Sequence, residues 1–535
     1  MTGADSVGTD LQIFEASDGL AVRLGRRALT HPARPVAAAR KRASSVPIDV
    51  NTLYILASPL LFHGFSEFKR RLPDSSIVVC VEQNGTLLEM SRSFAAKGLN
   101  GTDVLHSVDP HRTAEMITAI IPATIRRCRL ISFGSGASIA SEHYREIEQS
   151  VTKVLAGRAR NTATLIHFGR KWCRHLFRTL IESPVPLPDE RIFGSTPVLV
   201  AAAGESLETS IPLLKEYREH FRLVAVDAAV GPLAAWGIDP DVVVAVESQS
   251  ISTGHFHGRL SDASVLVHDL TCHPDVFRLW PPERRFFIAT RFADIHLFDR
   301  IRSLLARGIY LPGLGSVGIT SCAIASRLTE GNIILSGFDF SYVPGKPHSK
   351  HSLSFELSHM SAKRLAPDIL FELAMARPLI RGTGQDGSSY TSDSVLMSYC
   401  PHLGKVLDTE RASTLPRTGP DLAIPSAATE MVSTLFRRTI RPDRPLSSIV
   451  RDVHAAHGDP SYWHSRTRSF ITHERLLLKQ ARSASSALQT LRDVDYAWID
   501  FPDALDPQLP ESEHGKARIR SRIESYTRYL DYLST

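Results

Sequence analysis

The sequence predicts an α/β protein in which Rossmann-like parallel-sheet domains are followed by an α-helical C-terminal domain. The main observation is the stretch from Pro197 to Gln249, where three apolar runs alternate with two helical stretches. The runs are short and rich in β-branched or small residues, as buried strands are: Val198 to Ala203, Leu223 to Val226 and Val242 to Val246. Such alternation is typical of a parallel sheet with crossover helices.

A second, shorter α/β repeat near the N-terminus supports this fold class. Apolar runs on both sides of Asp18-Gly19 predict a β-hairpin. Further on, Thr52 to Ala57, Phe65 to Leu72 and Ile77 to Val81 predict a strand, a helix and a strand. The turn from Ser58 to Gly64 lacks the several glycines that a dinucleotide or methyl-donor site needs. We therefore expect a degenerate scaffold here rather than a second active site.

Helical periodicity dominates the chain from about Pro425 onward, and prolines separate the helices. The predicted helices are Ala427 to Arg437, Ser447 to His457, Tyr462 to Leu491 and Lys516 to Leu533. The predicted domains are residues 10–160 (the degenerate domain with its hairpin), a helical linker at 161–190, the central domain at 191–410 and the helical domain at 425–535. A binding role toward a protein acceptor is one expectation for the last domain.

Composition excludes several function classes. The 535 residues are 43% hydrophobic and 22% charged, which fits a globular protein of more than one domain. No apolar run is long enough for a membrane span. The six scattered cysteines form no CxxC pair, so we expect free thiols and a cytoplasmic location. The net charge of +6 is spread out without aromatic interleaving, so nucleic acid is not an expected partner.

The carboxyl ends of the three central strands carry the first candidate site residues. These are Gly204, Glu205 and Ser206 after the first strand, Asp227 after the second and Glu247 after the third. Ligands of parallel α/β sheets bind beyond these ends, so we expect the five residues to line one crevice. Pro212 is best tolerated in the first turn of a helix, which favours Ser210 over Ser206 as the helix N-cap.

A glycine-rich turn lies between a short strand and a helix predicted from Ile319 to Leu328. Gly313, Gly315 and Gly318 spell GxGxxG, and Asp339 ends the next strand. Together they resemble a dinucleotide fingerprint, which leaves a nicotinamide enzyme open. Against this, Pro312 disturbs the turn and the unit lies deep in the chain. The backbone amides of the turn would bind any phosphate.

The loop after Asp339 carries Tyr342, His348 and His351. A histidine beyond the carboxyl end of a strand is suited to act as a general base, because its ordinary pKa lies near neutrality.

Two further sequence patterns resemble metal-binding motifs, but neither predicts a metal site. His255 and His257 share a loop that offers no further ligand. The DxD sequence at Asp239 to Asp241 precedes its strand, on the edge opposite the expected crevice. No metal is predicted.

Several of these segments resemble the motility-associated factor (Maf) flagellin glycosyltransferases, whose shared domain is also described as 6-hydroxymethylpterin pyrophosphokinase MptE-like. The resemblance rests on GESLE, VDAAV, GIDPDVVVAVE and the run from Gly318 to His348. The stretch from Gly384 to Thr391 resembles a segment that follows this domain in the family, and the N-terminal region matches more loosely. The resemblance covers roughly residues 10 to 410.

The central domain is similar in turn to bacterial sialyltransferases that use CMP-activated sugars. Their GPSL turn falls on Gly204 to Leu207, and their nucleotide-binding TSG turn falls on Ser316, Val317 and Gly318. Their catalytic histidine matches His348 best, with His351 in reserve. Two residues depart from the pattern, since Glu205 replaces a proline and Glu247 replaces an aspartate.

The resemblance implies a glycosyltransferase that moves a nonulosonic (sialic-acid-like) sugar from its CMP-activated form to Ser or Thr of flagellin. The two glycine turns would hold the nucleotide, and Asp227 and Glu247 would bind ribose, base or sugar hydroxyls. Asp339 is a further candidate for donor binding. His348 would be the base and Tyr342 would stabilise the departing phosphate, with no cofactor required. The alternatives are a pterin pyrophosphokinase and a catalytically inactive flagellin-binding protein.

Overall fold

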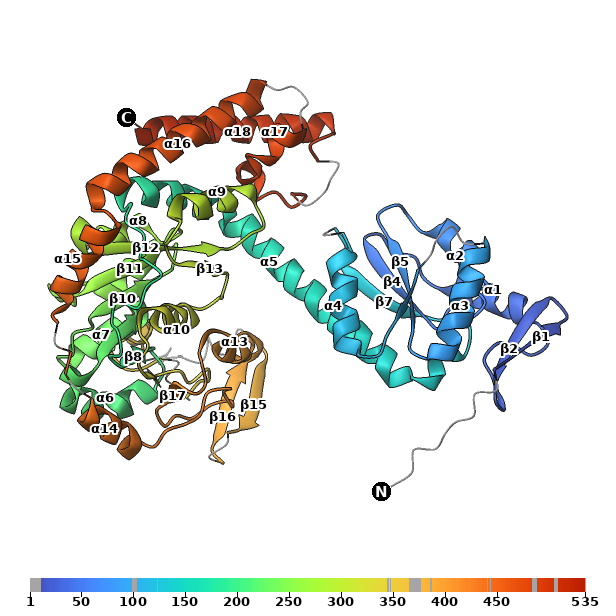
Figure 1. Ribbon diagram of the computed structural model, residues 1–535, viewed down its shortest axis with the longest axis horizontal. Coiled ribbons are helices and arrows are strands. Elements are labelled where there is room, and N and C mark those ends of the chain that lie inside the picture. Colours follow the sequence, from blue (N-terminus) through green and yellow to red (C-terminus); the bar gives the residue numbers. More distant parts are fainter. Residues whose placement is uncertain are drawn as a thin grey trace. The chain divides into compact units, whose positions relative to one another are not determined.

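The computed structural model describes residues 11–98, 103–122, 124–343, 346, 348–364, 377–384, 387–439, 441–442, 444–483, 488–504 and 509–534. The chain forms two compact units (Figure 1). Unit 1 comprises Met1–His167 and Asp500–Ser512, and unit 2 comprises Phe168–Ile499 and Glu513–Thr535. The four segments predicted from the sequence therefore fall into two units, because most of the C-terminal helices belong with the central sheet.

Unit 1 combines a small antiparallel sheet, which contains the predicted hairpin, with a four-stranded parallel sheet, which contains the predicted strand-helix-strand unit. The antiparallel strands pair in the order β1-β2-β3, and Ala16 lies opposite Gly19 at the hairpin turn. The parallel strands have the order β6-β5-β4-β7. The elements are β1 (Leu11–Ala16), β2 (Gly19–Leu24), β3 (Arg27–Ala28), α1 (Pro35–Ser45), β4 (Thr52–Ala57), α2 (Phe65–Arg71), β5 (Ile77–Glu82), α3 (Gly85–Gly98), β6 (Val104–His106), α4 (Pro110–Ile120) and β7 (Arg127–Ile131).

The turn after β4 is filled by its own apolar side chains. Leu60 and Leu61 are buried in a cluster with Val22 and Leu29 of the hairpin region. Leu60 holds a φ of 51°, a left-handed conformation that costs energy for a residue with a branched side chain. Packing against the hairpin offsets this cost, and a cavity of about 270 Å³ remains beside the turn, with Pro59, Leu60 and His63 in its lining.

Unit 2 is built on an eight-stranded parallel sheet with the order β13-β12-β11-β10-β9-β8-β14-β17. The strands are β8 (Val198–Ala201), β9 (Arg222–Val226), β10 (Val242–Ala245), β11 (Val265–Asp269), β12 (Arg285–Arg291), β13 (Tyr310–Pro312), β14 (Ile333–Ser336) and β17 (Ala412–Thr414). The chain runs outward from β8 to β13 and then returns to place β14 on the other side of β8. The strand order therefore reverses between β8 and β14, which is the switch point where ligands of such sheets bind.

Helices cover both faces of this sheet (Figure 1). One face packs against α10 (Val317–Leu328), α13 (Ser394–Val406), α15 (Leu446–His457) and α16 (Pro460–Ser483). The other packs against α6 (Ser206–Glu216), α7 (Asp227–Ala235), α8 (Pro274–Phe277) and α14 (Thr429–Arg438). The remaining elements of unit 2 are α9 (His296–Leu305), α11 (Leu353–Ser361), the antiparallel hairpin β15 (Leu379–Thr383) and β16 (Ser389–Asp393), α17 (Leu488–Arg492) and α18 (Glu513–Ser534).

The linker predicted at 161–190 is helical only as far as Glu182, as the end of a longer helix, α5 (Ser141–Glu182), which has 42 residues. Its last part lies in unit 2 and is bonded to loops at the carboxyl ends of strands. Trp172 donates from Nε1 to Ser248 Oγ at 3.0 Å, and Thr179 donates from Oγ1 to the Leu270 carbonyl at 3.0 Å. These bonds brace the loops after β10 and β11.

The C-terminal helices are held to the sheet by apolar packing and by a buried ion pair. Val432 and Phe436 of α14 join the core beneath α6. Arg300 of α9 donates to Glu474 of α16 at 2.6 Å, and the Glu474 side chain has no exposed surface. In the part of the chain that the structure describes, no helix is long and apolar enough to cross a bilayer.

Candidate functional site

The switch point brings together the turns that follow β8 and β14. The Gly204 amide donates to the Gly337 carbonyl oxygen at 2.9 Å. A Cβ atom on Gly204 would collide with that oxygen and would lie 2.5 Å from the Asp339 carboxylate. Glycine is thus required at position 204 by the close approach of the two turns, and the predicted residues Gly204 and Asp339 are neighbours.

Asp339 caps helix α6 from the next strand of the sheet. Its Oδ2 accepts a hydrogen bond from the Ser206 amide at 2.9 Å, and its Oδ1 accepts one from the Ser206 hydroxyl. Burial raises the pKa of Asp339, while the bonds from Ser206 oppose this shift. The prediction of Ser210 as the N-cap is wrong, because α6 begins at Ser206 and contains Pro212 in its interior. These bonds commit both Ser206 and Asp339 to shaping the turn.

The loop that carries His348 is bonded to the same turn. The Ser349 amide donates to the Ala203 carbonyl at 2.8 Å, and the Lys350 amide donates to Glu208 Oε1 at 2.8 Å. Lys346 Nζ lies 2.8 Å from Glu208 and 3.4 Å from Glu205. Glu205 replaces the proline of the related pattern. The positive charge of Lys346 partly neutralises its negative charge, which reduces the repulsion of a bound phosphate.

His348 itself keeps exposed surface at this rim. Its Nδ1 lies 3.1 Å from Ser354 Oγ at the start of α11. Loss of hydration among the surrounding loops lowers the pKa of His348. The imidazole is therefore neutral at physiological pH, the form that accepts a proton.

The reserve histidine, His351, occupies the turn that leads into α11. It has a φ of 66°, and its carbonyl oxygen accepts a hydrogen bond from Arg259 at 3.2 Å. Its side chain is exposed. Its backbone therefore helps to anchor the loop that carries His348.

Two carboxyl groups lie at the ends of the next strands. Asp227, the first residue of α7, is 3% exposed. Its Oδ1 accepts from the Ala228 amide at 2.8 Å, whereas Oδ2 has no partner among the described residues. Burial raises the pKa of Asp227 to about 6. Glu247 is more exposed, but loss of hydration and the Asp227 charge raise the pKa of its carboxyl. The two acids are thus close enough to influence each other.

The glycine turn before α10 reaches the same region. Gly315 has a φ of 75°, and a Cβ there would lie 3.1 Å from Cε1 of Tyr399. A Cβ on Gly318 would lie 3.0 Å from the ring of Phe338, the residue that follows Gly337. Ser316 occupies the N-cap position of α10 without a side-chain cap bond. The first turn of α10 is therefore suited to bind an anion through its amides.

Tyr342 is committed to a group that the sequence analysis missed. Its hydroxyl donates to Asp393 Oδ2 at 2.6 Å, and burial together with Asp393 raises the pKa of Tyr342. The Asp393 side chain has no exposed surface, caps α13 and pairs with Arg377 at 3.3 Å. An aspartate before an apolar helix is a recognisable N-cap signal, which could have identified Asp393 from the sequence.

The weaker metal patterns have other roles or positions. Asp241 pairs with Arg218 at 2.9 Å and with Arg222 at 3.1 Å, at the amino ends of the strands. Burial lowers the pKa of His255 to about 4. Among the described residues, no three His, Cys, Asp or Glu side chains are grouped so that they could hold a metal ion.

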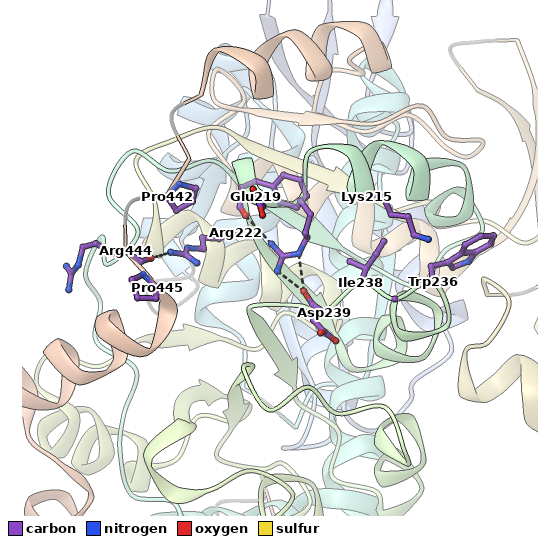
Figure 2. Close-up of a pocket in the computed structure, with 12 residues that line it drawn as sticks. Lys215, Glu219, Arg222, Trp236, Ile238, Asp239, Pro442, Arg444 and Pro445 are labelled. Atoms are coloured by element: carbon purple, nitrogen blue, oxygen red, sulfur yellow. Dashed lines mark hydrogen bonds between the residues drawn. The ribbon is translucent and has the colours of Figure 1, made fainter.

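A cavity of about 750 Å³ (Figure 2) lies at the amino edge of the sheet, whereas the residues described above lie at the carboxyl edge. Its lining includes Lys215, Trp236 and Arg444. The Arg218 guanidinium is bonded there to the Asp239 carbonyl oxygen at 3.1 and 2.6 Å.

We take the carboxyl edge of the unit 2 sheet as the candidate site and call it the rim site. It consists of Gly204–Ser206, Asp227, Glu247, Gly315–Gly318, Asp339 and His348.

Comparisons with known proteins agree with the sequence resemblance. Residues 175–345 match the family described as 6-hydroxymethylpterin diphosphokinase MptE-like. An uncharacterised protein of Treponema pallidum (strain Nichols) is 23% identical over 561 aligned residues, which cover 97% of this chain and 95% of that protein. A second uncharacterised protein of that organism is 28% identical over 88 residues, or 16% of this chain and 42% of its own length.

Among solved structures, the chain is similar to the Maf glycosyltransferase from Magnetospirillum magneticum AMB-1. The TM-score is 0.59 at 13% identity, and the match covers 98% of this chain and 91% of that one. The predicted fold class and the predicted MptE-like domain are both confirmed. Within the stretch from Gly384 to Thr391, Gln385 and Asp386 lie outside the described residues.

Proposed function

We propose that this chain, in which residues 175–345 form an MptE-like domain, is a glycosyltransferase that moves a nonulosonic sugar from a CMP-activated donor to Ser or Thr hydroxyls of flagellin. The observation that carries the proposal is the convergence of the Gly204 turn, the α10 N-terminus and the His348 loop at the switch point of the sheet. The fold shared with a Maf glycosyltransferase supports the reaction class.

The nucleotide would bind mainly through backbone groups. The amides of the first turn of α10 favour a phosphate, because they point outward and the helix dipole adds positive potential. Asp227 has an unpartnered oxygen in a buried position, where a ribose or sugar hydroxyl would donate to it. Glu247, being more exposed, would bind a hydroxyl nearer the mouth of the site.

The chemistry requires one proton transfer. The acceptor hydroxyl attacks the anomeric carbon, the bond from that carbon to the phosphate oxygen breaks, and CMP departs with the bonding electrons. His348 takes the hydroxyl proton through its neutral imidazole. The Tyr342 hydroxyl already donates a hydrogen bond to Asp393. It would stabilise the departing phosphate only if this bond became weaker. No metal or cofactor is required by this scheme.

A ligand screen followed by a transfer assay tests the proposal. CMP and CMP-sialic acid should raise the melting temperature, whereas NAD, ATP and hydroxymethylpterin should not, because only ligands of the native state stabilise it. Purified flagellin should then gain the mass of the sugar as CMP is released. Stabilisation by NAD with no response to CMP would overturn the proposal.

The match to the MptE-like family favours a second candidate, pyrophosphoryl transfer to a hydroxymethylpterin. It predicts magnesium-dependent formation of AMP from ATP and the pterin, which the same purified protein would reveal. A third outcome is capture of flagellin with no turnover of any donor, which would identify a binding protein that has lost activity.

A further inference from the structure

The buried carboxylate of Asp393, at the edge of the rim site, holds the side chains of Tyr342 and Arg377 side by side. Both of these side chains can donate hydrogen bonds to an anion. Asp393 Oδ2 accepts from the Tyr342 hydroxyl at 2.6 Å and from Arg377 Nη1 at 3.3 Å. Its Oδ1 accepts the amides of Val395 and Leu396 at 2.7 and 2.9 Å. Because Asp393 has no exposed side-chain surface and four hydrogen bonds, its position is fixed, and so is the spacing of Tyr342 and Arg377.

This pair belongs to the neighbourhood where the donor phosphate is proposed to bind. Tyr342 follows Asp339 by three residues, and its amide donates to the Thr391 carbonyl at 2.7 Å. Asp393 caps α13, and Tyr399 of the same helix packs against Gly315, in the turn before α10. The Arg377 guanidinium therefore lies on the α13 side of the proposed phosphate site.

Two other cations near this rim are already engaged. Lys346 pairs with Glu205 and Glu208. Arg259 pairs with Glu356 and also donates to the His351 carbonyl oxygen. Arg377 differs, since its side chain is 52% exposed and Asp393 is its single hydrogen-bond partner among the described residues. A guanidinium carries five N–H donors, so Arg377 retains an outward fork of the kind that matches a carboxylate.

The chemistry of the proposed donor calls for such a group. In a CMP-activated nonulosonic sugar, the anomeric carbon carries both the phosphate oxygen and a carboxylate, so the two anions lie next to each other. We propose that Arg377 binds the carboxylate of the sugar through its outward N–H groups and thereby selects acidic sugars. This inference rests on the proposed function and names the residue that binds the acid group of the sugar.

Calorimetric titration of CMP and of CMP-sialic acid tests the inference on the full chain. Arg377→Ala should weaken the binding of CMP-sialic acid by about 10- to 100-fold and change that of CMP by less than about 2-fold. Arg377→Lys should recover part of the loss, because it keeps the charge but not the planar fork. Arg438→Ala, which removes an exposed arginine at the end of α14, next to the Thr439 carbonyl that is bonded to His220 before β9, is the matched control and should leave both affinities unchanged.

The other possible results of the titration would overturn either this inference alone or the proposed function as well. An equal loss for CMP and CMP-sialic acid would mean that Arg377 binds the phosphate, and no loss for either would remove it from the site. Both outcomes overturn the inference and leave the proposed function standing. If the unmodified protein binds neither ligand, both proposals fail. Thermal unfolding of each variant verifies that the half-exposed position tolerates the change.

Discussion

The two units contain the same kind of parallel sheet, yet their carboxyl edges differ. In unit 1 the turn after β4 buries Leu60 and Leu61, which pack against the hairpin. In unit 2 the turn after β8 carries Gly204, and polar loops gather around it. The order of the strands is similar in the two sheets, so the side chains at the strand ends decide how polar each edge is. The proposed function places the chemistry in unit 2 and leaves unit 1 as a scaffold.

The largest effect is expected from removing the proposed base in unit 2. His348→Ala should lower the rate of sugar transfer by about 10²- to 10⁴-fold, because no other group at that position would accept the hydroxyl proton. His63→Ala in unit 1 is the control, since the His63 ring is bonded to the Leu20 carbonyl at 2.8 Å and should be silent in transfer. The rates would be measured under single-turnover conditions.

The pH profile gives a second readout of the same variant. Because the pKa of His348 is lowered from its ordinary value of 6.5, transfer by the unmodified protein should persist below pH 6.5. Equal rates for His348→Ala and the unmodified protein would refute the assigned role.

The next effect concerns stability in unit 1. Leu60→Ala removes a side chain that is 2% exposed and should lower the free energy of unfolding by about 2–5 kcal/mol through lost burial and a cavity. Met116→Ala, at a side chain that is 49% exposed, should cost less than about 0.5 kcal/mol. Urea titration followed by circular dichroism would measure both. If folded Leu60→Ala protein lost transfer activity, the proposal that unit 1 takes no part in the chemistry would be refuted.

A pH-dependent contribution to stability is expected from Asp227. Its pKa is raised from 3.8 to about 6, so the folded state holds this proton more tightly than the unfolded state does. The group therefore favours folding below about pH 4, and this contribution is lost as the pH rises through 6.

Asp227→Asn should remove that dependence, which amounts to at most about 3 kcal/mol for a shift of roughly two units. Unfolding free energies of both proteins at pH 4, 5, 6 and 7 provide the test. Parallel curves for the two proteins would show that Asp227 ionises normally.

The smallest effect is expected at the cap of α6. Ser206→Ala deletes the hydroxyl bond to Asp339 but keeps the amide bond, so it should cost about 1 kcal/mol of stability. Binding of CMP should be unchanged, because Ser206 serves the turn rather than the ligand. Weaker CMP binding at unchanged stability, seen by calorimetry and urea titration, would reverse this assignment.

These residues also indicate what the sequence could predict. The β-branched runs of β8, β9 and β10 predict the sheet, because burial on both faces leaves a local apolar pattern. Candidate site residues followed from the ends of those strands. The cap of α6 by Asp339 joins residues 133 positions apart, and the Tyr342–Asp393 bond spans 51 positions. A local sequence pattern cannot predict which distant residues pair, so the roles of Ser206 and Tyr342 could be found only from the structure.

The central claim is that a CMP-activated sugar binds at the carboxyl edge of the unit 2 sheet. Hydrogen–deuterium exchange with saturating CMP tests the location directly. We predict slower exchange in peptides that contain residues 204–208, 315–320 and 346–352, which surround the rim site. Protection confined to residues 215–222 and 236–239, which line the cavity at the opposite edge, would contradict the account.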